Sequence, residues 1–174
     1  MLKKILFSLA GLLSTLLILH LVAPNELKIE KEIVINQPKT FVFGYLKFFR
    51  NTMTWNPFLE KDPKAIVKLN GTDGTVGSSM YWSGNMDLGT GEQEIKTIVE
   101  NEKIDFEVRF IIPFQSTIHS YLITESIDQN QTRVKWGMSG KMPFPMNIIN
   151  MFKGGMNEAM QKDYGLSNHN GYSE

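Results

Sequence analysis

A long apolar stretch near the N-terminus restricts the structures that this chain can adopt more than any other feature of the sequence. Lys3 and Lys4 precede a stretch from Ile5 to Ala23 that contains no charged residue. As a helix rising about 1.5 Å per residue, this stretch is roughly 28 Å long, close to the ~30 Å hydrocarbon core of a bilayer. A helix without a polar face does not suit the surface of a soluble domain. The sequence therefore predicts a membrane-spanning helix over residues 5–23.

Two alternatives remain for this segment, a cleaved signal peptide and a buried core helix. A signal peptide has a shorter apolar region, about 7–15 residues, and a cleavage site flanked by small residues. The one plausible cleavage site here follows Ala23, and Pro24 directly after it obstructs cleavage. We expect an uncleaved anchor with residues 1–4 in the cytoplasm, because Lys3 and Lys4 favour that side. The folded domain would then be extracytoplasmic and anchored in the inner membrane.

Composition narrows what the rest of the chain can be. We expect one domain over residues 27–166 and a flexible polar tail over residues 167–174, since about 150 residues suffice for one core. The 18 basic residues balance the 18 acidic residues and form no basic stripe, which argues against nucleic acid as a partner. The chain has no cysteine, so disulfides, thiolate nucleophiles and zinc–sulfur sites are excluded.

Hydrophobic periodicity and turn residues predict an α+β domain. A strand at Leu27–Ile35 precedes a helix that starts near Pro38 and a short helical or turn element at residues 51–58. A final helix is expected from Met146 to about Tyr164. Six strands lie between, separated by turn signals. They are expected at Ala65–Leu69, Ser78–Ser83, Gly91–Val99, Lys103–Ile112, Ser116–Glu125 and Thr132–Met138.

The predicted strands have one apolar face and one charged face. In residues 103–112, for example, Phe106 and Phe110 point one way while Glu107 points the other. Such alternation indicates an antiparallel sheet that is covered on one side only. The predicted last helix carries an apolar stripe from Ile148 to Met160, which can supply the cover. We therefore expect a curved sheet of about seven strands wrapped around a long C-terminal helix.

This order of elements resembles the helix-grip fold of the START and pollen-allergen-like superfamily. Several short motifs are also similar to the SRPBCC, polyketide cyclase/dehydrase-like family and its membrane-anchored bacterial members. They are Glu32–Pro38 with Val42–Leu46, then Trp55–Phe58, Gly74–Gly77, Trp82–Asn85 with Gly89–Gly91, Trp136–Gly140 and Met142–Met146. The resemblance implies a fold shared by lipid carriers, receptors, cyclases and hydrolase-like enzymes, so function has to be argued from the site.

A helix that stands off a curved sheet leaves a mostly apolar cavity. Methionine side chains are flexible and polarizable, which suits a wall that adapts to its ligand, although core packing is the alternative. The expected Met-rich wall contains Met138, Met142, Met146, Met151, Met156 and Met160. The candidate ligand-binding residues are Trp55, Met80, Tyr81, Trp82, Asn85, Phe110, Trp136, Met138, Met151, Gly155 and Met156. For the tryptophans the alternative is structural packing, and for Asn85 it is a turn.

Residues for acid–base catalysis are scarce. His119 is the one histidine within the predicted domain, and His119 and Tyr121 are the candidates for moving a proton. Alternation leaves open which face of the sheet carries these two residues. Glu94 and Lys96 are expected on the solvated face. The inward positions of the same strand are expected to be Gln93, Ile95, Thr97 and Val99.

These observations support three hypotheses of different classes. The first is a membrane-anchored domain that binds a hydrophobic or amphipathic small molecule, or a lipid, in an internal cavity. The second is a cyclase- or dehydratase-like enzyme, and the third is a filled scaffold that acts on another protein. No P-loop, metal-ligand spacing or nucleophile elbow occurs, and no cofactor or metal is implied.

Overall fold

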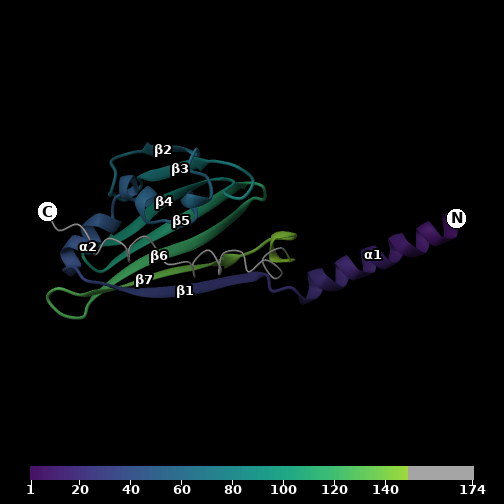
Figure 1. Cartoon of the computed structure of the whole chain (residues 1–174), viewed down its shortest axis with the longest axis horizontal. Helices are drawn as coiled ribbons and strands as arrows, with labels where there is room; N and C mark the ends of the chain where they lie inside the picture. Colours follow the sequence, from purple (N-terminus) through teal and green to yellow (C-terminus); the bar gives the residue numbers. More distant parts are fainter. Residues whose placement is uncertain (149–174) are drawn as a thin grey trace.

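The computed structural model describes residues 1–148, which form a curved sheet with a long helix extending from one end (Figure 1). The chain runs through α1 (Leu2–Val22), β1 (Glu26–Ile35), α2 (Lys39–Leu46), the 3-10 helices η1 (Phe49–Thr54) and η2 (Leu59–Lys61), β2 (Ile66–Asn70), β3 (Ser79–Ser83), β4 (Thr90–Val99), β5 (Lys103–Ile112), β6 (Ser116–Ser126) and β7 (Thr132–Lys141). The predicted C-terminal helix lies outside the described residues, except that residues 146–148 are helical.

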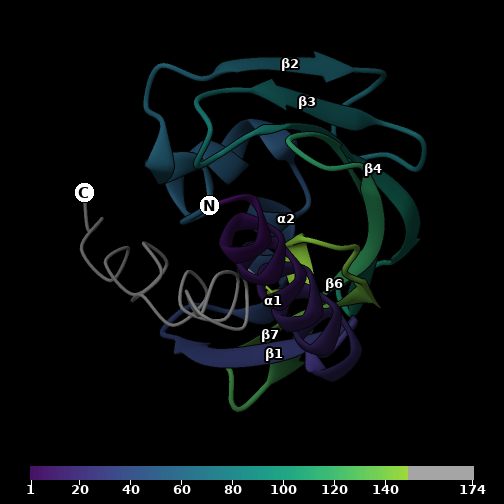
Figure 2. The same cartoon turned by 90° about the vertical axis from the view of Figure 1, so that its right-hand side faces the viewer.

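The seven strands are ordered β1-β7-β6-β5-β4-β3-β2, and every neighbouring pair is antiparallel. Strands β2 to β7 therefore form a meander, and β1 adds to its edge beside β7. The end-on view in Figure 2 shows this sheet curling around the segment that contains α2. The α+β class and the curved antiparallel sheet predicted from the sequence are confirmed.

The chain between β1 and β2 crosses the concave face of the sheet. It packs on the half that is remote from α1, where Val42, Phe43 and Leu46 of α2 are buried. The ring of Phe49 in η1 lies 6.0 Å from the ring of Phe106 on β5. We call this region the packed half; its sheet residues are Ile95, Ile104, Phe106, Leu122 and Val134, all buried.

α2 and η1 do not line the half nearer to α1, where the crossing segment contributes Asn56, Phe58, Leu59 and Lys61 at the border of an open space. The sheet residues of this half point to the same concave side but border open space. We call this region the hollow half; it consists of Met80, Trp82, Gln93, Val108, Phe110, Ser120, Trp136 and Met138. The difference between the halves places the candidate site.

A β-bulge in β4 corrects part of the predicted alternation. The register against β5 shifts between Ile95 and Thr97, so Ile98 rather than Thr97 pairs on the concave side, opposite Ile104. Thr97 donates a hydrogen bond to Asp105 on the outer face, and Val99 is exposed. The predicted inward orientation of Thr97 and Val99 is wrong, because a bulge inserts one extra residue and reverses the alternation beyond it.

Candidate ligand-binding cavity

A cavity of about 450 Å³ lies against the hollow half. Its apolar lining is Phe58, Leu59, Met80, Trp82, Met86, Leu88, Val108, Phe110, Ile112, Pro113, Phe114, Trp136, Met138, Met142 and Met146. Its polar lining is Asn56, Lys61, Asp87, Gln93 and Ser120. Small-molecule pockets have volumes of roughly 300–1,000 Å³ and mostly apolar walls with a few polar groups, so both size and lining suit a ligand.

A cross-strand glycine makes room for the largest side chain in this wall. Gly91 on β4 is paired with Trp82 on β3. A Cβ at Gly91 would lie 2.5 Å from the Trp82 ring and 2.7 Å from the backbone oxygen of Arg109. The indole therefore lies flat across β4 and meets Phe110 edge-on, with ring centroids 6.0 Å apart. A larger residue at Gly91 would force Trp82 toward the cavity.

Trp136 is fixed at the centre of the wall. Its indole N–H donates to the hydroxyl of Ser120 over 3.0 Å, across the β6–β7 pair. Trp55 and Phe58, which come from the crossing segment, contact the Trp136 ring edge-on at 5.3 and 5.8 Å. Such edge-to-face contacts add to the stability gained by burial. Trp136 is therefore a rigid part of the lining.

Few polar groups in the wall are free to meet a ligand. The Gln93 amide makes no hydrogen bond to any residue in 1–148. Ser120 accepts from Trp136, which leaves its own hydroxyl proton to donate. The side-chain oxygen of Asn56 is occupied by the backbone N–H of Phe58. Gln93 and Ser120 thus offer a donor and an acceptor on the sheet side of the cavity, where the other lining side chains are apolar.

The structure brings five of the predicted ligand-binding residues together in this lining: Met80, Trp82, Phe110, Trp136 and Met138. Trp55 is buried behind Trp136 and is not part of the lining. Tyr81 lies on the outer face, because its neighbours Met80 and Trp82 point inward. Met151, Gly155 and Met156 lie outside the described residues.

Asn85 lies in the loop between β3 and β4 and also does not line the cavity. Its amide nitrogen donates to the Lys61 carbonyl oxygen over 3.0 Å, and its backbone N–H donates to Asp62. Its side-chain oxygen accepts from the backbone N–H groups of Asp87 and Leu88. All of these contacts shape the loop, so the structure gives Asn85 the turn role that was its alternative.

His119 and Tyr121 lie on the outer face of β6, away from the cavity. His119 contacts Asp105 at 2.9 Å. Burial alone would raise the pKa of Asp105, but hydrogen bonds from Lys103, Thr97 and His119 outweigh burial and hold it below its ordinary value. Tyr121 lies across Gly137 and donates a hydrogen bond to Glu30, which raises the pKa of Tyr121 to about 12. Neither side chain can reach a molecule in the cavity.

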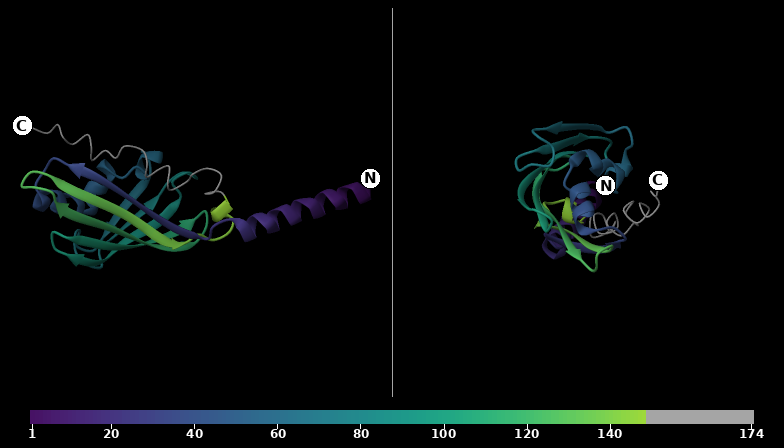
Figure 3. Two further views of the ribbon diagram at one scale, coloured as in Figure 1. Left: turned by 90° about the horizontal axis from the view of Figure 1, so that it is seen from below. Right: turned by 90° about the vertical axis from the view of Figure 1, so that its left-hand side faces the viewer.

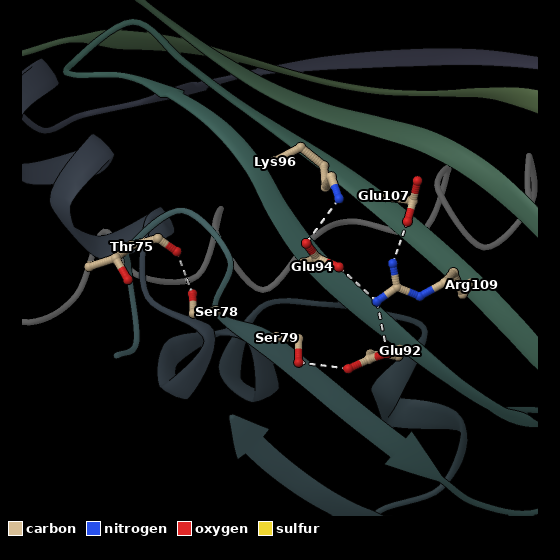
Figure 4. A network of polar contacts seen from close by, with 8 residues as sticks. All are labelled: Thr75, Ser78, Ser79, Glu92, Glu94, Lys96, Glu107 and Arg109. Atoms are coloured by element: carbon tan, nitrogen blue, oxygen red, sulfur yellow. Dashed lines mark hydrogen bonds and ion pairs between the residues drawn. The ribbon is translucent and has the colours of Figure 1, made fainter. Parts of the chain in front are cut away.

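The strand carboxylates belong to a solvated network on the same outer face (Figure 4). Arg109 pairs with Glu92 at 2.8 Å and with Glu94 at 2.9 Å, and it also contacts Glu107. The hydrogen bonds from Arg109 and Ser79 hold the pKa of Glu92 below its ordinary value. This network agrees with the solvated face expected for Glu94.

Several lining residues could have been found from the sequence and others could not. Val108, Ile112, Gln93 and Ser120 share the inward alternation of their strands with predicted residues. The rest of the newly identified lining comes from loops and from the crossing segment, where no periodicity exists: Asn56, Phe58, Leu59, Lys61, Met86, Asp87, Leu88, Pro113 and Phe114.

Solved structures with the same arrangement place this geometry among known folds. A protein of Nitrosospira multiformis is similar with a TM-score of 0.57 at 14% identity, over 82% of this chain and 95% of that chain. Ara h 8.0201 is similar with a TM-score of 0.54 at 15% identity, over 83% of this chain and 97% of that chain. Protein CV1439 of Chromobacterium violaceum is similar with a TM-score of 0.55 at 14% identity, over 82% of this chain and 95% of that chain.

The chain has a helix-grip fold. At these identities the likeness establishes the fold alone. No family model matches the chain, and no curated protein matches its sequence. Function therefore has to be argued from the cavity and from α1, whose residues Lys3–Val22 are long and apolar enough to span a membrane.

Proposed function

We propose that this chain is a membrane-anchored, extracytoplasmic domain that binds one hydrophobic or amphipathic small molecule in the cavity of the hollow half. The observation that carries the proposal is the 450 Å³ space itself, bounded by aromatic and methionine side chains where the other half of the same face is filled. We also propose, from the motifs, that it is a membrane-anchored member of the SRPBCC polyketide cyclase/dehydrase-like family.

The lining favours a ligand that is mainly apolar with one polar group. Met80, Trp82, Phe110, Trp136 and Met138 would contact its apolar part, and burial of that part would drive binding at about 25 cal/mol per Å². Gln93 and Ser120 would accept from or donate to its polar group, since a buried polar group is costly unless it is hydrogen-bonded. These roles extend the ligand-binding residues expected from the sequence.

The composition of the wall favours binding over the cyclase- or dehydratase-like alternative. The lining within residues 1–148 contains no histidine and no tyrosine. Its ionisable side chains are Lys61 and Asp87, which form no ion pair with each other in this part of the chain. A general acid–base pair needs two groups that converge on the substrate. The proposal therefore includes no reaction step.

Gln93 provides the sharpest test of the cavity. Replacing Gln93 by Trp places a large ring in the open space, and we expect it to abolish ligand binding by the detergent-extracted full chain. Gln93→Leu removes the amide at similar size, and we expect about a tenfold loss of affinity, or ~1.4 kcal/mol. Thr117→Trp adds the same ring to an exposed outer-face position and should leave binding unchanged.

Mass spectrometry of small molecules that co-purify with the gently extracted protein identifies the ligand. Wild type and Thr117→Trp should retain the same molecule, and Gln93→Trp should lose it. If no molecule co-purifies with wild type and no lipid raises its melting temperature, the binding proposal fails. Equal retention by Gln93→Trp would place the ligand outside the cavity.

A further inference from the structure

The cavity is bordered by apolar side chains that point into solvent. Met86 in the β3–β4 loop is 73% exposed, and Phe144 after β7 is 50% exposed. Ile111, Ile112 and Pro113 at the β5–β6 turn are exposed as well, with Phe114 beside them. We call these six residues the apolar rim. Exposed apolar residues that cluster in this way mark an interaction surface, whereas scattered ones do not.

The loops of the rim are held together at their bases. Gly89, at the end of the β3–β4 loop, has a positive φ of 73°. A Cβ at this position would lie 2.4 Å from the backbone oxygen of Ile112, so the β3–β4 loop packs directly on the end of β5. A side chain there would be strained by both the φ angle and the contact. The β3–β4 loop and the β5–β6 turn therefore form one surface.

The rim is at the end of the sheet from which α1 extends (Figure 3). In the β1–β7 register, Glu26 pairs with Lys141, so the start of β1 lies beside the end of β7. Met142 donates its backbone N–H to the Asn25 carbonyl oxygen over 2.8 Å. The ring of Phe144 in the rim meets the ring of His20 in α1 edge-on at 5.3 Å. These contacts fix the end of β7 and Phe144 next to the C-terminal end of α1.

The connection between α1 and the sheet is too short to let this end move far from a bilayer. α1 ends at Val22 and β1 begins at Glu26, which leaves residues 23–25 between them. Three residues span at most about 10 Å, even when fully extended. If α1 crosses the membrane, the rim must face the surface where α1 emerges.

The opposite end of the sheet has different turn chemistry. Its turns are polar and include residues 70–74, Asn101-Glu102 and residues 128–131. Val34, Phe41, Leu69, Val76, Val99 and Ile127 are exposed there, but each is flanked in sequence by residues that are polar, glycine or at least partly buried, whereas Ile111–Phe114 in the rim is a continuous apolar run. Single exposed apolar residues are normal on soluble surfaces. The sheet is thus apolar at the end that α1 leaves and polar at the other.

We propose that the apolar rim docks on the outer surface of the same bilayer that α1 spans, so that the cavity opens into lipid. This inference rests on the proposed anchoring and ligand binding, and it adds the source of the ligand: an amphiphile that enters from the membrane without crossing water. The tether keeps the rim at a high effective concentration near lipid, so weak apolar contacts suffice. Lys61 and Asp87, the ionisable residues of the described lining, balance in charge, so docking should not require anionic lipid.

Depth-dependent quenching tests this docking on the full chain. Because the protein has no cysteine, each introduced cysteine carries the only fluorescent label. Labels at Met86→Cys and Ile112→Cys report the rim, Leu13→Cys reports α1, and Gln129→Cys reports the polar end. In vesicles of zwitterionic lipid with a doxyl quencher in the acyl chains, we expect rim labels to be quenched at least about twofold more than Gln129→Cys, as for residues buried at an interface.

A charge in the rim should reverse this effect. Met86→Asp, carried together with the label at Ile112→Cys, should lower quenching to the level of Gln129→Cys. The matched control is Val76→Asp, which places the same charge on an exposed apolar residue at the polar end and should change nothing. Met86 is exposed, so the substitution leaves the packed half intact.

The outcomes separate this proposal from the function on which it rests. Rim labels quenched no more than Gln129→Cys, with Leu13→Cys fully quenched, would overturn docking and leave the anchor standing. An unquenched Leu13→Cys would overturn the anchor itself. A rim label that is shielded from water but not quenched by lipid would mean that a second copy covers the rim. Quenched rim labels on a protein that binds no ligand in detergent would retain docking and remove the binding function.

Discussion

The packed half and the hollow half of the concave face are built on the same central strands. On β5, Ile104 and Phe106 are buried in the packed half, where Phe106 meets Phe49 of η1. Val108 and Phe110, the next inward-pointing residues along the strand, border the cavity. The strands supply apolar side chains to both halves at the same period. What differs is the crossing segment, whose α2 and η1 fill one half, while its residues 56–61 border the cavity in the other half.

The comparison teaches that a stable core and a binding cavity can share one sheet when they are separated along the strands. The packed half contributes most of the stability of the fold, because its residues are buried against other side chains. The hollow half then keeps open space without making the whole domain unstable. Removing and adding volume in each half should therefore give opposite results.

Loss of volume in the packed half should give the largest effect. Phe106→Ala removes a buried ring in contact with Phe49 and should lower the free energy of unfolding by about 3–5 kcal/mol. Met138→Ala, in the hollow half, should cost clearly less because one side of Met138 already borders open space. Denaturant unfolding of both variants, followed by tryptophan fluorescence, measures the difference. Equal losses would remove the distinction between the halves.

Added volume should give the next largest effect and the reverse pattern. Ile95→Phe forces a larger side chain into a fully buried position and should cost about 1–3 kcal/mol. Val108→Phe points into the cavity, so we expect less than about 1 kcal/mol of destabilisation together with loss of ligand binding. A melting curve with and without ligand reports both quantities. A strongly destabilised Val108→Phe would show that the cavity is filled in solution.

The ion pairs on the outer face of the sheet should make the stability of the domain depend on pH. The pKa values of Glu92 and Glu94 are held below the ordinary 4.5, for Glu92 first by Arg109 and for Glu94 first by Lys96. Their contribution to stability is therefore present above about pH 4.5 and is lost as the pH falls through their lower, folded-state values. We expect a loss of about 1 kcal/mol or less, since exposed ion pairs contribute little.

A single substitution can isolate this part of the pH dependence. Arg109→Gln removes the partner that both carboxylates share and should flatten the stability profile below about pH 4.5. Ligand binding should stay level between about pH 6 and pH 9, because the lining of residues 1–148 holds no group that ordinarily titrates there. A profile that stays as steep in Arg109→Gln as in wild type would assign the acid sensitivity to other groups.

The smallest effect is expected at the former catalytic candidates. His119→Ala and Tyr121→Phe change the outer face only, and each should alter ligand affinity by less than about 0.5 kcal/mol. Tyr121→Phe should also remove the tyrosine that titrates at about 12, which a tyrosinate absorption titration detects. A large loss of binding in either variant would mean that the outer face communicates with the cavity.

Five cavity residues could be predicted because strand alternation is local. Met80 and Trp82 share a parity on β3, Trp136 and Met138 lie on the inward side of β7, and Phe110 continues the apolar face of β5. The loop residues of the cavity, such as Met86 and Phe114, carry no such periodicity. Their contribution depends on how the ends of distant strands meet.

The face that carries His119 shows the same limit. In β6 both sets of alternating residues contain apolar and polar side chains, so the sequence does not determine which set points inward. Pairing with β5 decides the matter, because His119 is opposite Glu107 and Ser120 is opposite Phe106. The bulge between Ile95 and Thr97 has a similar effect in β4. Its one extra residue exchanges the inward and outward positions in the rest of the strand.

The sequence by itself determined the apolar N-terminal helix, the order of the strands and the apolar face of most of them, since each follows from the period of neighbouring side chains. Only the tertiary structure decided that α2 and η1 cover one half of that face, that a cavity remains in the other half, and that loops lining the cavity lie at the end of the sheet beside α1. These features depend on contacts between residues far apart in the chain. They also depend on how completely side chains fill the space between elements, which the periodicity of neighbouring residues does not determine.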